Sequence, residues 1–361
     1  MVKSRPPRLV ARVDPVRLLV AVAVIASTVA YAVWVPPAIL THIDHYVFVR
    51  ALDRMRHGQA YYPAMRDALQ SMHIVAGRAD AFRFPLLFEV LRWIPGSMLH
   101  LCFYAFVVVG ASLLVLRLSS EPIAALLVAV YLLVAGQSPA IGGSIRDWML
   151  VELWAVPVIA GALLAHRRRH WWLAALLVGV AVLIREINAP LLLGGLLYAH
   201  RRDLPRKPWM VVLGACGAAF AVHLAVAANY VRPHGTDAAL FGSASPTSVF
   251  NMLTYRSSIP IALGLLLWGL AWRRVVKLGI VDFAGPLLAI PLLGLVVDRP
   301  YWGFLMMPFV VMWSTEALAE VVRGRLGERT GTADAGSSRL AHTREPAPRT
   351  PAAEPALPSA R

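Results

Sequence analysis

Long apolar segments separated by short basic runs constrain this chain more than any other feature. Of its 361 residues, 58% are hydrophobic and only 15% are charged. A soluble domain of this size cannot bury so much apolar surface, so the sequence predicts an all-α polytopic membrane protein. About ten segments have the length and composition of transmembrane helices: Leu18–Leu40, Met98–Leu116, Pro122–Ala140, Trp148–Ala165, two short helices within Trp171–Tyr198, Trp209–Val231, Ile259–Trp272, Leu278–Val297 and Phe304–Val321.

The basic runs set the predicted topology. The formal net charge is +15, and Arg and Lys gather in residues 1–17, in HRRRH (166–170) and in HRRDLPRK (200–207). Short loops rich in Arg and Lys stay in the cytoplasm, so this pattern indicates a membrane protein and argues against nucleic acid as a partner. One helix over residues 171–198 would put the last two basic runs on opposite sides. Two short helices that meet at Arg185–Pro190 keep both inside.

The chain therefore has three predicted parts. Residues 1–17 form a basic cytoplasmic N-terminus, and residues 18–321 form the transmembrane domain, with an external loop at residues 41–97. Residues 322–361 are rich in Pro, Ala, Thr and charge without apolar periodicity, which predicts a disordered cytoplasmic tail. Because the internal loops are short, any chemistry is expected on the extracytoplasmic face.

The external loop opens with an amphipathic stretch, Thr41–Tyr62. Its apolar residues recur at helical spacing, which predicts a helix lying in the membrane interface. Gly58 is the predicted stop of that helix, and Tyr61 and Tyr62 follow it. Asp44 stands at the expected N-cap position, where it could cap the helix or act as a base at the water–lipid boundary.

Charged residues also occur where the chain is expected to lie in or near the membrane. Arg185 and Glu186 fall in the predicted break between two short helices, and intramembrane charges point to function by default. A mutual ion pair is the structural alternative. Arg299 follows a predicted span and could meet an anionic head group, or could anchor the interface together with Tyr301 and Trp302.

Other titratable residues give weaker signals. Asp147 and Glu152 are candidate second acids, although each could instead pair with a neighbouring cation. His45 and His234 have no partner at metal-ligand spacing, so no metal site is predicted.

These features together resemble the GT-C membrane glycosyltransferases. The chain is most similar to the bacterial polyprenol-phosphate-mannose-dependent α-mannosyltransferases, glycosyltransferase family 87. The resemblance rests on Asp44, Tyr46, Ala51, Gly58, Tyr62, Phe84-Pro85, Arg299-Pro300-Tyr301 and Pro308. It implies a GT-C-like fold and transfer of a hexose, which is mannose in this family, from a polyprenyl-phosphate sugar. The acceptor would be an extracytoplasmic glycan or glycolipid, and the reaction would invert the anomeric centre.

The resemblance also suggests roles for individual residues. Asp44 would be the general base, Arg185 and Arg299 would bind the donor phosphate, and Tyr61, Tyr62 and Glu186 would contact substrate. Arg83 and Arg256 are the next candidates for the phosphate contact. No cofactor or metal is expected. The expected partners are the lipid-linked donor, the acceptor and membrane lipid, for a multi-pass protein of the cell membrane.

Two other classes of protein fit the same pattern. A transporter or flippase of lipid-linked sugars would also use broken helices and intramembrane charges. A non-catalytic membrane subunit would tolerate the change Asp44→Ala. The long external loop with an acid at its start favours the enzyme.

Overall fold

The computed structural model of the chain describes residues 14–34, 43–73, 82–135, 151–231, 261–278, 286, 288 and 303–338. At several helix ends, including residues 43–45 and 325–338, only the backbone is described. The chain divides into two compact units, Met1–Leu318 and Ala319–Arg361. Every regular element within the described ranges is a helix, so the predicted all-α class is confirmed for that part of the chain.

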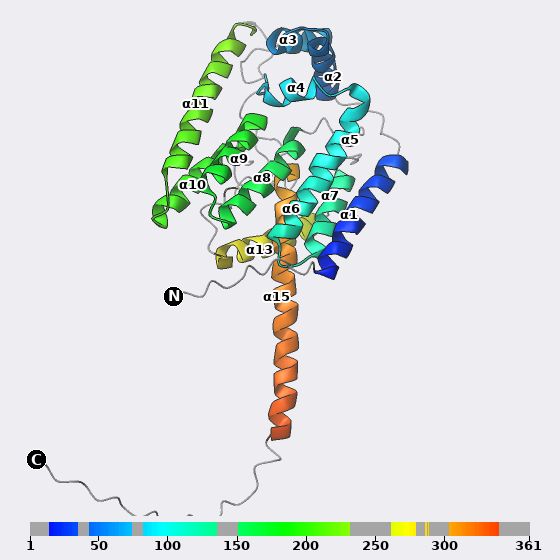
Figure 1. Cartoon of the computed structure of the whole chain (residues 1–361), viewed down its shortest axis with the longest axis vertical. Helices are drawn as coiled ribbons and strands as arrows, with labels where there is room; N and C mark the ends of the chain where they lie inside the picture. Colours follow the sequence, from blue (N-terminus) through cyan, green and yellow to red (C-terminus); the bar gives the residue numbers. More distant parts are fainter. Residues whose placement is uncertain are drawn as a thin grey trace, which may run out of the picture. The chain divides into compact units, whose positions relative to one another are not determined.

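Figure 1 shows the helices of the chain, labelled in sequence order. Their bounds are α1 Pro15–Trp34, α2 Ile43–Arg56, α3 Tyr61–Ser71, α4 Leu86–Leu91, η2 Gly96–Met98, α5 Leu99–Phe103, the π-helical η3 Tyr104–Gly110, α6 Ala111–Leu118, α7 Ile123–Ala135, α8 Val151–Arg167, α9 Trp171–Ile184, η6 Glu186–Asn188, α10 Ala189–Arg201, α11 Lys207–Ala228, α13 Ile261–Leu278 and α15 Gly303–Ser338.

Three helical stretches are long and apolar enough to cross a membrane: Gly96–Leu118, Lys207–Ala228 and Leu305–Gly324. Helix α1 carries exposed apolar side chains at Leu18, Leu19, Val22, Ile25 and Val29, and α11 does so at Met210, Val211 and Val222. Apolar faces of this kind are stable in lipid and unfavourable in water. Membrane character is therefore supported.

The number of membrane crossings stays a prediction. Each predicted span except Leu278–Val297 overlaps a described helix over most of its length, and most of Leu278–Val297 lies outside the described residues. The predicted division of residues 171–198 is present, since α9 ends at Ile184 and α10 begins at Ala189. Arg185 there has an extended backbone, with φ −152° and ψ 114°. The Asn188 side-chain amide donates to the Ala181 carbonyl at 2.9 Å, which satisfies an acceptor at the end of α9.

Two predicted helix boundaries differ from the structure. Helix α2 begins at Ile43, so Asp44 lies in its first turn and not at the N-cap position before it. Helix α15 runs to Ser338, although the sequence predicts disorder from residue 322. The stretch EALAEVVRGRL after Thr315 contains many strong helix formers, which favours continuation of the helix. Residues 339–361 lie outside the described part.

The predicted stop at Gly58 is confirmed. Gly58 has φ +92°, a left-handed conformation that glycine adopts without steric cost. The Gly58 amide donates to the Met55 carbonyl at 3.0 Å and the Gln59 amide to the Arg54 carbonyl at 3.1 Å. This pair of bonds is a Schellman motif, which ends α2 and turns the chain into α3.

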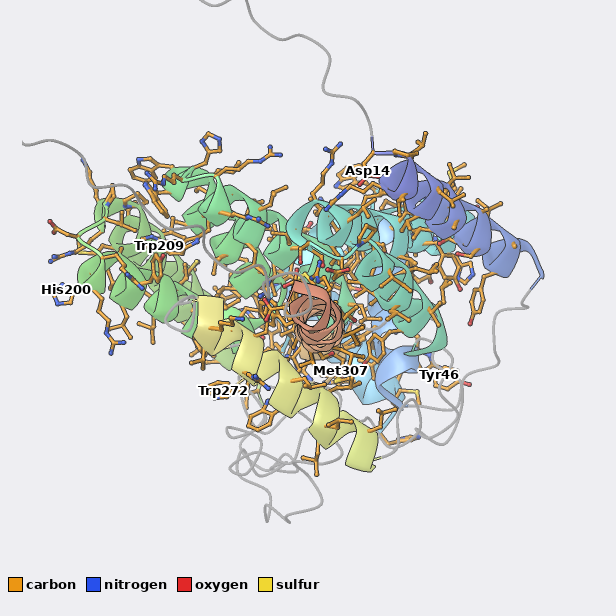
Figure 2. All side chains as sticks on the ribbon, turned by 90° about the horizontal axis from the view of Figure 1, so that it is seen from below. Asp14, Tyr46, His200, Trp209, Trp272 and Met307 are labelled. Atoms are coloured by element: carbon orange, nitrogen blue, oxygen red, sulfur yellow. The ribbon has the colours of Figure 1, made fainter. Side chains whose placement is uncertain are left out.

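Helices α2, α3 and α4 pack together at one end of the first unit (Figure 1). Their small core contains Val47, Ala51, Met55, Tyr61, Ala64, Met65, Ala68, Phe82 and Phe88, and it also includes Ala227 of α11. A larger core joins the other helices of this unit. At its centre Leu305–Ser314 of α15 is buried, as the end-on view around Met307 shows (Figure 2).

The α2–α3 turn and the α8–α9 turn are expected on opposite sides of the membrane. In a variant with Cys102 and Cys216 replaced by Ser, a cysteine at Gln59 should react with an impermeant maleimide added outside intact cells. A cysteine at Arg168 should react only after the cells are opened, because its basic run favours the cytoplasm. Labelling at Arg168 from outside would contradict the predicted topology.

Candidate active site

An ion-pair cluster occupies the break between α9 and α10. The Arg185 side chain is only 2% exposed, and its Nε lies 2.7 Å from Glu152 Oε1 of α8. Its Nη1 lies 2.5 Å from Glu186 Oε1. The extended backbone at Arg185 separates the two helices and leaves room for this side chain between them. The structural alternative of an Arg185–Glu186 ion pair is therefore present, and Glu152 extends it.

Arg83 reaches the same cluster from the segment before α4. Its Nη1 lies 3.9 Å from Glu186 Oε1, and its side chain is 24% exposed. Within the described ranges, Glu186 is the one acidic group that pairs with Arg83, whereas Arg185 contacts two carboxylates. Of these two arginines, Arg83 is thus the one more accessible to a further anion.

Glu186 is held in its charged form by these cations. The guanidiniums of Arg185 and Arg83 lie 2.5 Å and 3.9 Å from its carboxylate, and neighbouring cations favour the charged form of a carboxyl group. At neutral pH the cluster therefore consists of two guanidiniums and two acidic side chains close together. Such a cluster can exchange one carboxylate contact for a phosphate contact with little change in geometry.

Tyr61 contacts Arg83, and Tyr62 packs against Tyr61, but the two tyrosines have different roles. The Tyr61 side chain is buried, and its hydroxyl donates to the Arg83 carbonyl at 2.5 Å. Burial raises the pKa of Tyr61 well above its usual value, so the hydroxyl keeps the proton that it donates. Tyr61 therefore fixes the backbone that carries Arg83 and does not line an open path.

Tyr62 is partly exposed and joins α3 to α11. Its hydroxyl lies 2.9 Å from His223 Nδ1, and His223 Nε2 lies 3.1 Å from the Phe82 carbonyl. A carbonyl can only accept, so Nε2 carries a proton, and in the neutral ring Nδ1 accepts from Tyr62. The Tyr62 ring also stacks on Tyr230, with centroids 5.8 Å apart and planes 11° apart.

An aromatic wall surrounds this hydrogen-bonded chain. Phe84 lies 5.1 Å from the His223 ring, and Phe82 lies 6.2 Å from the Tyr62 ring. Arg66 sits over the Tyr230 ring at 5.7 Å. The cluster thus has a charged side at Arg83 and Glu186 and an aromatic side at Tyr62, which suits a ligand with an anionic group and an apolar or ring-shaped part.

The structure brings together four of the predicted site residues and leaves two undescribed. Arg185 and Glu186 touch, Tyr61 reaches them through Arg83, and Tyr62 packs against the Tyr61 ring with centroids 5.1 Å apart. The side chain of Asp44 and all of Arg299 lie outside the described residues, as do Asp147, His234 and Arg256. Their predicted roles stay predictions.

Two residues of the site gave weaker signals in the sequence. His223 is a lone ionisable residue in an apolar helix, and such residues are functional candidates by default, so this rule could have singled it out. Glu152 was only one of several candidate acids, and its contact with Arg185 spans 33 positions of the chain. In the described part of the chain, no three His, Cys, Asp or Glu side chains are placed to hold a metal ion.

Comparison of the chain with protein-family models, with curated proteins and with solved structures found no match.

Proposed function

We propose that this chain is an inverting hexosyltransferase that takes a hexose, mannose by the family resemblance, from a polyprenyl-phosphate donor. The acceptor is an extracytoplasmic glycan or glycolipid. The observation that carries the proposal is the partly exposed Arg83 guanidinium beside Glu186, at the junction of the helices and the α2–α4 layer. The position of Asp44 in the sequence, at the start of the α2–α4 layer, also supports the proposal.

The reaction requires one base and one cation. The Asp44 carboxylate takes the proton of the acceptor hydroxyl, whose oxygen forms the new bond to the anomeric carbon. The bond between that carbon and the phosphate oxygen breaks, and the polyprenyl phosphate leaves with the electron pair on that oxygen. Because a phosphate is a good leaving group, a guanidinium that stabilises its charge is sufficient and no acid is needed.

Arg83 is assigned the donor phosphate contact in this proposal. Arg185 is already bound by Glu152 and Glu186, so its part is to hold Glu186 in place. Glu186 in turn positions the Arg83 guanidinium. Arg299 remains a second candidate for the phosphate, and the exposed edge of Tyr62 is assigned to the sugar or the first isoprene unit.

The direct test is transfer by the purified protein. Radiolabelled polyprenyl-phosphate mannose is supplied with extracted envelope glycolipids, and the labelled product is identified by chromatography and mass spectrometry. Formation of a labelled glycolipid with the inverted linkage is expected. Absence of transfer from every polyprenyl-phosphate hexose supplied would remove the proposal.

A transporter of lipid-linked sugars is the second candidate, favoured by the break between α9 and α10. Discontinuous helices form substrate sites in many transporters. Proteoliposomes that contain the labelled donor and no acceptor separate the two functions. Movement of the donor between leaflets without any sugar transfer would favour the transporter.

Changing Arg83 to Gln should raise the KM for the donor about tenfold with little change in kcat. This follows from the loss of one charge-assisted hydrogen bond, which contributes about 1.5 kcal/mol or more. Arg92→Gln is the matched control, because Arg92 is also partly exposed and pairs with Glu89 at 3.1 Å on the neighbouring α4. The KM is measured by donor titration of both variants. Equal values for Arg83→Gln and the parent would exclude Arg83 as the phosphate contact.

A further inference from the structure

A cavity lies within the first unit, at the ends of α9 and α10 remote from Glu186. It has a volume of about 340 Å³ and is lined by side chains that include Arg167, Arg169, Arg274, Glu316, Trp171 and Tyr198. These come from α8, the α8–α9 turn, α9, α10, α13 and α15. The proposed transfer reaction uses none of these residues.

The cavity has more positive than negative charge. Three arginines face one carboxylate among its lining residues. That carboxylate is already satisfied, since Glu316 Oε2 accepts from Arg274 Nε at 3.0 Å and Oε1 accepts from the Ser120 amide at 2.9 Å. Among the residues that the structure describes, no carboxylate pairs with Arg167 or Arg169, so both add positive charge to the cavity. Arg167 is oriented by a 2.5 Å hydrogen bond to the Leu118 carbonyl.

The backbone of Arg169 gives an independent reason to assign a role to its side chain. Helix α8 ends in a Schellman motif, with the Arg169 amide donating to the His166 carbonyl and the His170 amide to the Ala165 carbonyl, both at 2.9 Å. Arg169 holds the left-handed position with φ +63°, where glycine or asparagine is normally found. An arginine there costs about 1 kcal/mol of conformational strain, and such strained residues cluster at ligand sites.

The walls of the cavity are aromatic. Trp171 and Tyr198 both pack against the His166 ring, at 5.1 Å and 4.8 Å between centroids. Trp and Tyr are enriched where a membrane protein meets the head groups, and basic pockets between helices on the cytoplasmic side bind phosphate-bearing lipids. Figure 2 looks onto this end of the helices, where α13, marked by Trp272, lies beside α15.

We propose that this cavity binds a phosphate group, held by Arg167 and Arg169 with Arg274 at its edge. The same chemistry is offered by an anionic lipid head group and by a soluble phosphate, so the test includes both. The site is separate from the Arg83–Glu186 cluster and does not depend on the proposed transfer activity.

The test uses the full chain purified in detergent and native mass spectrometry. Mixed micelles supply phosphatidylglycerol or, as a zwitterionic control, phosphatidylcholine, and inorganic phosphate is added as a competitor. Retention of phosphatidylglycerol over phosphatidylcholine is expected in the parent chain. Arg167→Gln and Arg169→Asn should each lower it about fivefold, which corresponds to the loss of one cation near an anionic head group.

Arg168→Gln is the matched control, since Arg168 belongs to the same basic run but does not line the cavity. Asparagine tolerates the left-handed backbone, so Arg169→Asn is expected to fold. Binding of inorganic phosphate with the same arginine dependence, but no lipid retention, would assign a soluble phosphate. Retention that is unselective in the parent, or that falls equally in Arg168→Gln, would overturn the site.

Discussion

Replacing Asp44 with Asn is expected to lower the transfer rate about 100-fold or more while folding and donor binding are retained. Asparagine keeps the shape of the side chain and much of its ability to bond the first turn of a helix, but it cannot accept the acceptor's proton. Helix α2 contains Asp44 in its first turn, where a carboxylate is also favoured by the helix dipole. Losing that favourable charge should cost no more than about 1 kcal/mol of stability, so the loss of activity should be much the larger effect.

Asp53→Asn on the same helix is the control for Asp44→Asn. The Asp53 side chain is 66% exposed and lies 3.8 Å from His57, at the opposite end of α2. Both variants are purified, checked for thermal unfolding and donor affinity, and compared in kcat with the labelled donor. Full activity in Asp44→Asn would remove the base assignment and favour the transporter. Loss only in Asp53→Asn would mean that the other acid of α2 is the base.

The sequence predicted the elements of this fold better than the contacts between them. The stop at Gly58 and the break after Ile184 depend on the backbone preferences of a few neighbouring residues, which can be recognised in the sequence. Hydrophobic periodicity is also a local property, so it predicted where the helices lie along the chain. The pairing of Arg185 with Glu152 and the bond from Tyr62 to His223 join residues 33 and 161 positions apart, and no periodicity encodes which helices meet.

The contacts of Arg185 in the structure change the role that we expect for this residue. From the sequence, Arg185 is a donor-phosphate ligand whose loss weakens binding and leaves the protein intact. In the structure its guanidinium is almost fully buried and contacts two carboxylates. Removal of such a cation leaves buried carboxylates without compensation and is expected to destabilise the fold, so the more exposed Arg83 is the better candidate for the substrate.

Arg185→Gln is therefore expected to destabilise the protein by about 3 kcal/mol or more. Removing one partner of a buried ion pair leaves the other charge without compensation, and here that charge is Glu152, whose side chain is only 7% exposed. The measurement is the free energy of unfolding in detergent with increasing denaturant, together with the yield of folded protein in the membrane.

Two further variants separate stability from binding. The double change Arg185→Met with Glu152→Leu should recover most of the lost stability, because it replaces the buried pair with apolar side chains and leaves Glu186 with Arg83. Arg83→Gln should lose less than about 1 kcal/mol, since Arg83 is partly exposed and 3.9 Å from its partner. If Arg185→Gln is as stable as the parent and instead binds the donor more weakly, the guanidinium of Arg185 leaves its carboxylates for the phosphate. The donor contact then belongs to Arg185, as the sequence alone predicts.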